Sequence, residues 1–393
     1  FSLVVNRGTM KKIQGGVCAP IGFKASGVHC GIRKNKTKRD LSLIVSDVRA
    51  AAACVYTQNL VKGAPILVTK KHMADGYASA IVCNSGNANT CNENGEEIAE
   101  QMCGLVADAA GISANDVIVA STGVIGQPLS LDPIREGMPS LVSGLSEEGS
   151  SLAAQGIMTT DTIPKEIAYS FQLGGKECHI GAIGKGVGMI NPNMATMLIF
   201  ITTDAAISHA MLQKALSADV KDSFNMVSVD GDTSTNDMVA VLANGCAGNE
   251  PVIAPGKDFN AFRKALNKVT TYLCRKIAGD GEGATKLLEC KVTGAKSKAA
   301  ARTVAKSVIK SNLFKAAMFG YSGADVDITK VSVDFRSRAG ELAVCRNGSG
   351  IPFSEEEAKK ILSEKEIEIL IGLDDGSGKA TAWGCDLTYE YVK

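Results

Sequence analysis

A loop-forming stretch meets an apolar run almost at the middle of this 393-residue chain. The loop side, Lys185 to Ala195, contains two glycines, a proline and two asparagines, which favour tight or left-handed backbone and exclude a regular element. From Met197 to Thr203 the residues are apolar or β-branched, as in a short strand that is buried on both faces. The pattern therefore predicts that Thr196 opens a core strand directly after a shaped loop.

A threonine at such a junction has two interpretations. In the first, it satisfies a backbone group of the loop and fills a strand position, for which threonine has a high propensity. In the second, a strained loop exposes the carbonyl of the Ala195–Thr196 bond to the Thr196 hydroxyl, which allows an N-to-O acyl shift and hydrolysis of the resulting ester. Cleavage would free an α-amino group that titrates near neutrality and accepts the proton of its own hydroxyl. The pattern alone leaves both open.

The residues around this junction resemble a known signature. Residues 185–198, Lys-Gly-Val-Gly-Met-Ile-Asn-Pro-Asn-Met-Ala-Thr-Met-Leu, are similar to the self-cleavage and nucleophile motif of the ornithine acetyltransferase family, also called glutamate N-acetyltransferases. Other segments resemble the same family, in the same order along nearly the whole chain: 15–23, 84–89, 121–126, 158–162, 230–237 and 279–286. Each segment alone is weak evidence, but the ordered set is specific.

The resemblance implies an activity and a catalytic mechanism. It implies ping-pong transfer of an acetyl group from N2-acetyl-L-ornithine to L-glutamate in arginine biosynthesis, after self-cleavage between Ala195 and Thr196. Thr196 would then carry the acetyl group. The resemblance also implies that the Thr122 hydroxyl and the Gly123 N–H form the oxyanion hole. Preorganised donors of this kind stabilise a tetrahedral intermediate.

Substrate binding is implied at Thr159, Lys185 and Glu282, together with Thr196. From charge, we expect Lys185 to pair with an α-carboxylate and Glu282 with the side-chain ammonium group of ornithine. No metal or bound cofactor is expected, although bifunctional family members also use acetyl-CoA as a donor. The resemblance further suggests self-association, with two copies of each cleaved piece.

Two rival functions remain. An autoproteolytic aminopeptidase of the same superfamily would pass the acyl group to water instead of to glutamate. An uncleaved, inactive amino-acid-binding protein would keep the pocket but would never free the amine of Thr196. Segments 184–188 and 279–283 are glycine-rich but lack the spacing and context of nucleotide-binding loops.

The composition excludes several classes of partner. Lys and Arg number 42 against 41 Asp and Glu, so a net charge of +1 favours neither nucleic acid nor an anionic membrane, and a small-molecule substrate is expected. The 12 cysteines are scattered without a Cys-x-x-Cys pair and the four histidines are well separated. These spacings predict reduced thiols, structural histidines and no metal site. No membrane-length segment is evident, and we expect a cytoplasmic location.

Alternating strand and helix patterns predict an α/β fold with layered, buried mixed sheets and a smaller α/β domain at the C-terminus. The expected division is a catalytic domain over 10–285 and a second domain over 286–393, with 1–9 as an upstream extension before Met10. The basic run 33–39 is predicted to be a solvated loop, and 230–237 a turn instead of a calcium loop. Predicted strands are 41–46, 79–84, 117–120, 197–203 and 287–292; predicted helices are 95–110, 131–145, 208 towards 224, 258–278 and 296–318.

Overall fold

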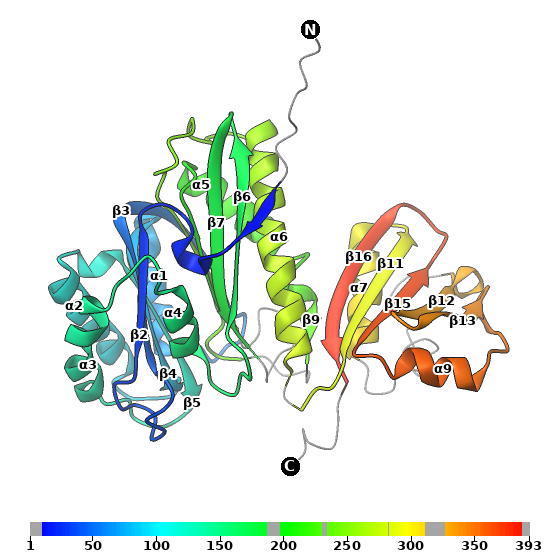
Figure 1. Ribbon diagram of the computed structural model, residues 1–393, viewed down its shortest axis with the longest axis horizontal. Helices are drawn as coiled ribbons and strands as arrows, with labels where there is room; N and C mark the ends of the chain where they lie inside the picture. Colours follow the sequence, from blue (N-terminus) through cyan, green and yellow to red (C-terminus); the bar gives the residue numbers. More distant parts are fainter. Residues whose placement is uncertain (1–9, 187–196, 230–233, 282, 311–326, 387–393) are drawn as a thin grey trace, which may run out of the picture. The chain divides into compact units, whose positions relative to one another are not determined.

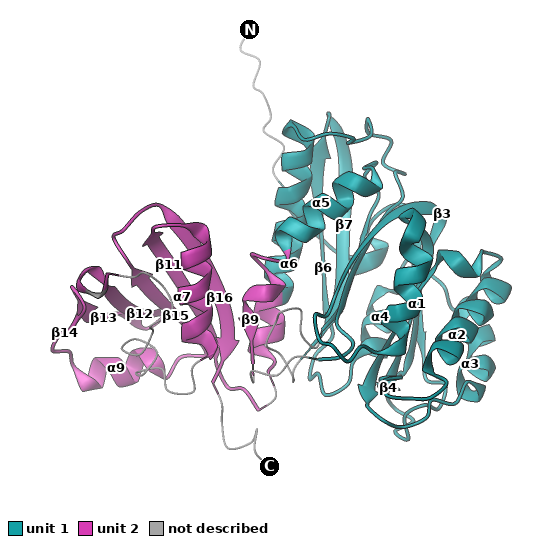
Figure 2. Ribbon diagram, turned by 180° about the vertical axis from the view of Figure 1, so that it is seen from behind, with its two compact units in different colours: residues 1–186, 196–219, 234–273 teal, residues 187–195, 220–233, 274–393 magenta. Residues whose placement is uncertain are grey.

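A computed structural model describes residues 10–186, 197–229, 234–281, 283–310 and 327–386 (Figure 1). The chain divides into two compact units (Figure 2). Among the described residues, the first unit contains 10–186, 197–219 and 234–273, and the second contains the rest. Both units combine strands and helices, which confirms the predicted α/β class. The predicted domain division after residue 285 stays a prediction.

The described strands of the first unit form a nine-stranded mixed sheet in the order β1-β6-β7-β8-β10-β3-β4-β5, with β2 also paired to β3. The strands are β1 Lys11–Ile13, β2 Phe23–Val28, β3 Leu41–Tyr56, β4 Tyr77–Asn87, β5 Val117–Val124, β6 Lys165–Leu173, β7 Lys176–Lys185, β8 Leu198–Thr203 and β10 Met238–Ala243. The helices are α1 Ala64–His72, α2 Gly95–Ala110, α3 Asp132–Ser143, α4 Ser150–Ile157, α5 His209–Asp219 and α6 Lys257–Gly279, of which the part up to Leu273 belongs to this unit.

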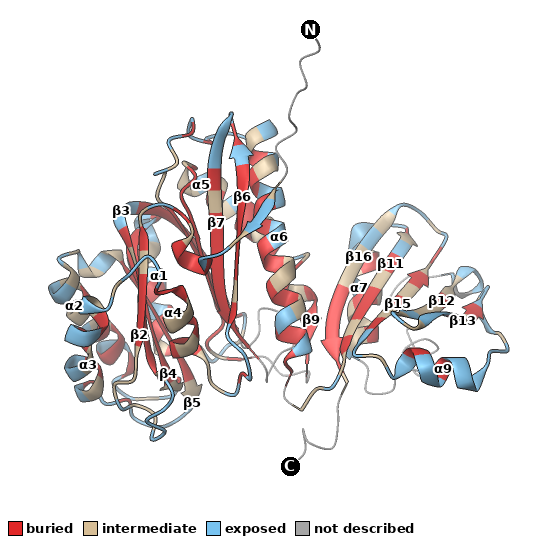
Figure 3. Ribbon diagram, in the orientation of Figure 1, coloured by how far each residue is buried: buried red, intermediate tan, exposed pale blue. Residues whose placement is uncertain are grey.

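Strand β3 joins the two parts of this sheet. Its first residues pair with β2 and β4, its last six pair with β10, and residues 47–49 between them are exposed. One core cluster gathers apolar side chains from β2 to β5, from β7, β8 and β10, and from α4. A second cluster packs α2 and α3 against the other face of β3, β4 and β5 (Figure 3). Strand β8 is buried along its whole length, as predicted.

Helix α2 has the predicted bounds, but its buried face is rotated. The helix ends where Gly111, with a φ of 69°, donates its N–H to the Ala107 carbonyl at 2.9 Å. The helical spacing of Ile98, Met102, Val106 and Ala109 predicts one buried face, but Ala109 is exposed, whereas Ala99 and Cys103 are fully buried. Small side chains on both flanks of the apolar stripe left the periodicity ambiguous, and packing against the sheet decided which flank is buried.

Several other predicted boundaries shift. Strand β3 continues ten residues beyond the predicted 41–46, and β5 continues to Val124, so the Thr122–Gly123 pair lies inside a strand and not in a following turn. Lys185, assigned to the loop, is the last residue of β7. The Ser208 hydroxyl accepts the Met211 N–H at 3.3 Å, as expected of a cap, but α5 ends before 224.

The second unit is built on a seven-stranded sheet in the order β14-β13-β12-β15-β11-β16-β9. Helix α7 packs on β11 and β16, and α9 packs on β12 and β13. The predicted helix over 296–318 begins at 298, and its part beyond 310 lies outside the described residues. The elements are β9 Val227–Ser228, β11 Leu287–Ala295, α7 Lys298–Lys310, β12 Ser332–Ser337, β13 Gly340–Arg346, β14 Ser349–Gly350, α9 Glu355–Leu362, β15 Glu366–Gly372 and β16 Gly378–Cys385.

Candidate functional site

Thr122 lies near the end of β5, where β5 runs parallel to β4 and pairs Thr122 with Ser85. Its side chain is buried, and its Oγ1 atom accepts a hydrogen bond of 3.3 Å from the Lys185 ammonium group. Because an ammonium group can only donate, this contact leaves the Thr122 hydroxyl hydrogen available to another acceptor. The structure therefore brings together two residues that the sequence singled out separately, from positions 63 residues apart.

Gly123 follows in a backbone conformation that favours glycine. Its φ is +133°, and a Cβ atom there would lie 2.3 Å from the Gly86 carbonyl carbon and 2.5 Å from the Asn87 nitrogen. The pairing of β4 with β5 shifts register at this point. A side chain at 123 would therefore push the two strands apart beside Thr122.

Lys185 is buried at the end of β7, where it forms the last described pair of the β7–β8 ladder with Leu198. Burial lowers the pKa of Lys185 from its ordinary value of 10.5, and the Asp161 carboxylate opposes that change. Leu198 lies two residues after Thr196, so the pairing places the Lys185–Thr122 contact beside the beginning of the strand that follows the predicted cleavage bond.

Asp161 organises the surroundings of Lys185. Its Oδ1 atom accepts hydrogen bonds from the Lys165 ammonium group at 2.7 Å and from the Gly186 N–H at 2.9 Å. Its Oδ2 atom accepts the Thr159 N–H at 3.1 Å. Burial alone would raise the pKa of Asp161, but the ammonium groups of Lys185 and Lys165 lower it overall. The carboxylate is therefore charged. It fixes the backbone of Thr159 directly, and it lies close enough to Lys185 for the two charges to interact.

Thr159, predicted to bind substrate, is only partly buried. Its carbonyl accepts a hydrogen bond from Arg33 at 3.1 Å, and Arg33 also donates to the Met158 carbonyl at 2.8 Å. The solvated-loop prediction is right for the exposed residues 34–38 but wrong for both ends of the run, since Arg39 also donates to the Gly27 carbonyl at 3.0 Å. A guanidinium group can donate to several carbonyls at once. Arg33 thereby links the basic run to residues 158 and 159, and Arg39 links it to Gly27.

The segment before β10 supplies a buried amide and a buried acid. The side-chain nitrogen of Asn236 donates to the Ala88 carbonyl at 2.6 Å and to the Ser121 carbonyl at 2.9 Å, which ties the segment to β5. Asp237 accepts the Met197 N–H through Oδ1 at 2.8 Å. Residues 234–237 thus form a bend with side-chain contacts to its surroundings, whereas 230–233 lie outside the described residues, so the turn predicted over 230–237 stays a prediction.

Three predicted site residues, Ala195, Thr196 and Glu282, lie outside the described residues. Within the described part of the chain, no group of His, Cys, Asp and Glu has the arrangement needed to hold a metal ion. All 12 cysteines are described; none forms a disulfide, and nine are buried. Each histidine ring has a nearby carbonyl or carboxylate, as expected for structural residues. No helix among the described residues combines the length and hydrophobicity needed to span a membrane.

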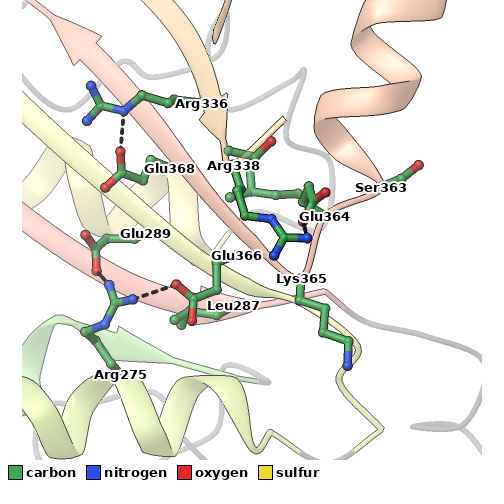
Figure 4. A pocket seen from close by; sticks show the side chains of 12 residues that line it. Arg275, Leu287, Glu289, Arg336, Arg338, Ser363, Glu364, Lys365, Glu366 and Glu368 are labelled. Atoms are coloured by element: carbon green, nitrogen blue, oxygen red, sulfur yellow. Dashed lines mark hydrogen bonds and ion pairs between the residues drawn. The ribbon is translucent and has the colours of Figure 1, made fainter. Parts of the chain in front are cut away.

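The second unit contains a pocket of about 610 Å³ that the sequence did not predict (Figure 4). Its lining includes four basic and four acidic side chains. Arg275 donates to Glu289 and Glu366, and Arg336 donates to Glu368. Because these charges compensate one another within the lining, the pocket presents no surplus of either sign to attract a charged ligand.

Comparison with known proteins gives consistent matches. The ArgJ family model matches residues 24–393. The arginine biosynthesis bifunctional protein ArgJ of Symbiobacterium thermophilum is 48% identical over 98% of this chain and 98% of its own length. The protein of the same name from Bacillus subtilis is 44% identical over 97% and 96% of the two chains. A crystal structure of the Bacillus halodurans protein of that name, 36% identical, covers 48% of this chain and 99% of its own, with a TM-score of 0.45.

Proposed function

Because the chain belongs to the ArgJ family, we propose that it is an acyltransferase of arginine biosynthesis that moves an acetyl group from N2-acetyl-L-ornithine to L-glutamate. Relatives that share 43–48% of their residues over nearly the whole chain bear the name of an arginine biosynthesis enzyme. Such coverage leaves no large part of the chain to carry an unrelated activity.

In the proposed mechanism, the chain first cleaves itself between Ala195 and Thr196. The new α-amino group then takes the proton of the Thr196 hydroxyl, which attacks the acetyl carbonyl of N2-acetyl-L-ornithine. Ornithine leaves, and an acetyl ester remains on Thr196. The amine of glutamate attacks this ester in turn, so that N-acetylglutamate is released and the hydroxyl is restored. The mechanism uses no metal and no bound cofactor.

The contact between Lys185 and Thr122 is the observation that carries this proposal. Each tetrahedral intermediate develops a negative charge on the former carbonyl oxygen, and that charge needs donors in a water-poor site. The Thr122 hydroxyl is buried, accepts from Lys185, and retains a hydrogen to donate. Its partner Lys185 pairs with Leu198, two residues after Thr196.

The substrate's charged groups find partners of opposite sign in this proposal. The Lys185 ammonium group is buried, so a substrate α-carboxylate would interact with it in a medium of low dielectric constant. Glu282 would bind the side-chain ammonium of ornithine, and Thr159 would contribute a hydroxyl contact. Arg33 and Asp161 hold the backbone of Thr159 in place for that contact.

The relatives are named bifunctional, and we extend the proposal accordingly. In a second activity, acetyl-CoA would acetylate Thr196 in place of N2-acetyl-L-ornithine, and glutamate would again be the acceptor. The active form would contain two copies of each cleaved piece. Release of free CoA in the presence of both acetyl-CoA and glutamate would test the second donor.

The first experiment is the intact mass of the purified protein under denaturing conditions. Cleavage predicts two masses, for residues 1–195 and 196–393, and Thr196→Ala is expected to give one. Incubation with N2-acetyl-L-ornithine alone should then add one acetyl group to the 196–393 piece, and glutamate should remove it. Initial rates over a grid of both substrates should give the parallel double-reciprocal lines of a ping-pong mechanism.

The same measurements separate the rival functions. An aminopeptidase would release the acyl group to water at a rate that glutamate does not change. An amino-acid-binding protein would remain a single chain and would bind ornithine without turnover. Either result would replace the acetyltransferase proposal.

A further inference from the structure

Two buried carboxyl groups lie at the two ends of the predicted cleavage segment. The last described pair of the β7–β8 ladder is Lys185 with Leu198. Immediately beyond that pair, Gly186 on one strand donates its N–H to Asp161 at 2.9 Å, and Met197 on the other donates its N–H to Asp237 at 2.8 Å.

We propose that Asp161 and Asp237 are positioning residues for self-cleavage, each holding the backbone on one side of the Ala195–Thr196 bond. The inference rests on the proposed function, since it requires that the bond is cut. Neither residue needs to contact the reacting atoms. Asp237 acts through the Met197 N–H that it holds, and Asp161 acts through the Gly186 N–H together with the Lys165 ammonium group.

Burial makes these two contacts consequential. Asp161 is 5% exposed and Asp237 is 1% exposed, and both hydrogen bonds are buried. A buried N–H that loses its partner carries the full penalty of its lost hydration, so the backbone would move to find another acceptor. Met197 is fixed on its other side as well, because its carbonyl accepts the Met238 N–H at 3.1 Å. The residue directly after Thr196 is thus held from both sides by 237 and 238.

The two carboxyl groups differ in their electrostatic surroundings. Asp161 lies beside Lys165 and Lys185, and these ammonium groups keep its pKa below the ordinary value. Burial raises the pKa of Asp237 well above the ordinary value, against the opposing effects of the Met197 N–H and of Lys185. Among the described residues, the Oδ2 atom of Asp237 has no hydrogen-bond partner. The surroundings therefore favour the charged form of Asp161 and disfavour that of Asp237.

This difference predicts opposite results for the same chemical change. Asp237→Asn keeps the shape of the side chain, places an uncharged group where burial disfavours a charge, and retains an oxygen that can accept the Met197 N–H. Asp161→Asn also keeps an acceptor, but it removes the carboxylate that pairs with Lys165 and that offsets the effect of burial on the pKa of Lys185. Asp237→Leu removes the acceptor altogether.

The chain offers a matched control at the far end of β8. Asp204 is fully buried and also accepts backbone N–H groups, from His179 at 2.6 Å and from Ile21 at 3.0 Å. Asp204 follows the last residue of β8, Thr203, whereas the predicted cleavage bond lies before the first residue of that strand, Leu198. Asp204→Asn therefore perturbs a similar buried carboxyl just beyond the far end of β8 without touching the cleavage segment.

The experiment follows self-cleavage in time. The full chain and its variants are made by cell-free synthesis, the folded fraction is isolated by size exclusion, and intact masses are recorded at intervals. Wild type, Asp237→Asn and Asp204→Asn should cleave at rates within about threefold of one another. Asp237→Leu and Asp161→Asn should cleave about 10- to 100-fold more slowly, the loss expected for one buried hydrogen bond or charge. Thermal unfolding of each folded fraction reports stability separately.

The outcomes are distinct. If folded Asp161→Asn and Asp237→Leu cleave at the wild-type rate, the positioning role is wrong. If Asp237→Asn is as slow as Asp237→Leu, acceptance of the Met197 N–H does not explain the effect and the inference falls for Asp237. If the wild type itself remains one chain, the proposed function fails and the inference falls with it.

Discussion

Thr122→Val tests the proposed oxyanion donor most directly, because valine keeps the shape of threonine and removes only the hydroxyl. In the structure this hydroxyl is buried and accepts from Lys185 at 3.3 Å. Loss of one oxyanion donor lowers kcat by about 100- to 1,000-fold. The Lys185 ammonium group also loses a partner, which should lower the free energy of unfolding by about 1–3 kcal/mol.

The assay separates these two effects. Ornithine release from N2-acetyl-L-ornithine and glutamate gives kcat and KM for protein already shown to be cleaved, and urea titration gives the free energy of unfolding. Thr122→Ser restores the hydroxyl and should recover most of kcat. Thr203→Val is the matched control, since its buried hydroxyl donates to the His179 carbonyl at 2.7 Å at the opposite end of β8.

We expect Thr203→Val to lose stability but to keep kcat within about threefold, whereas Thr122→Val should lose kcat far beyond what its stability change explains. Cleaved Thr122→Val with an unchanged kcat would refute the oxyanion assignment. An equal loss of kcat in both valine variants would assign the effect to stability and not to the transition state.

Four further predictions concern stability and reactivity. Gly123→Ala should destabilise the fold by at least about 1–3 kcal/mol in urea titration, because its backbone conformation and the nearby Gly86 exclude a side chain. Lys165→Met leaves the Asp161 carboxylate buried without its closest cation and should cost about 3–5 kcal/mol by the same method. Because the pKa of Asp161 is lowered in the folded state, its charge stabilises the fold fully at pH values above the ordinary pKa of 3.8, and this contribution is lost as the pH falls through the folded-state pKa. Asp161→Asn should therefore flatten the acid limb of a profile of unfolding free energy against pH. Under native conditions, mass-spectrometric mapping of iodoacetamide adducts should find the exposed Cys91 and Cys246 first, and a buried cysteine among the earliest adducts would contradict the fold.

The sequence predicted those elements whose local pattern and tertiary environment agree. Residues 95–110 have helical periodicity throughout and end at a glycine, and their bounds are confirmed. The second half of β3 was missed because residues 50–53 are four consecutive alanines, and alanine has little intrinsic preference for strands. Pairing with β10 makes that run a strand, and such pairing between distant segments leaves no local pattern to recognise.

The site was predicted in part. Thr122 and Lys185 were singled out from separate motifs and do meet, although their proposed roles stay predictions. Asp161 and Asp237 lay within segments that the resemblance selected, but no role was assigned to either. Lys165 was missed; the signal available was a lysine at the start of a strand whose other residues are mostly apolar, where it could only be buried if paired.

The energetic cost of this cluster argues that it serves chemistry more than stability. Asp161, Lys165, Lys185 and Asp237 are all buried, and each ionised group has given up its hydration. Apolar side chains of similar volume would often stabilise such a core at least as well, as replacements of buried ion pairs in other proteins show. What apolar side chains cannot do is hold the Gly186 and Met197 N–H groups, orient the Thr122 hydroxyl and present a cation to a carboxylate. The proposed self-cleavage offers an explanation for these buried polar groups, since they would fix backbone and donors on both sides of the bond that is proposed to be cut.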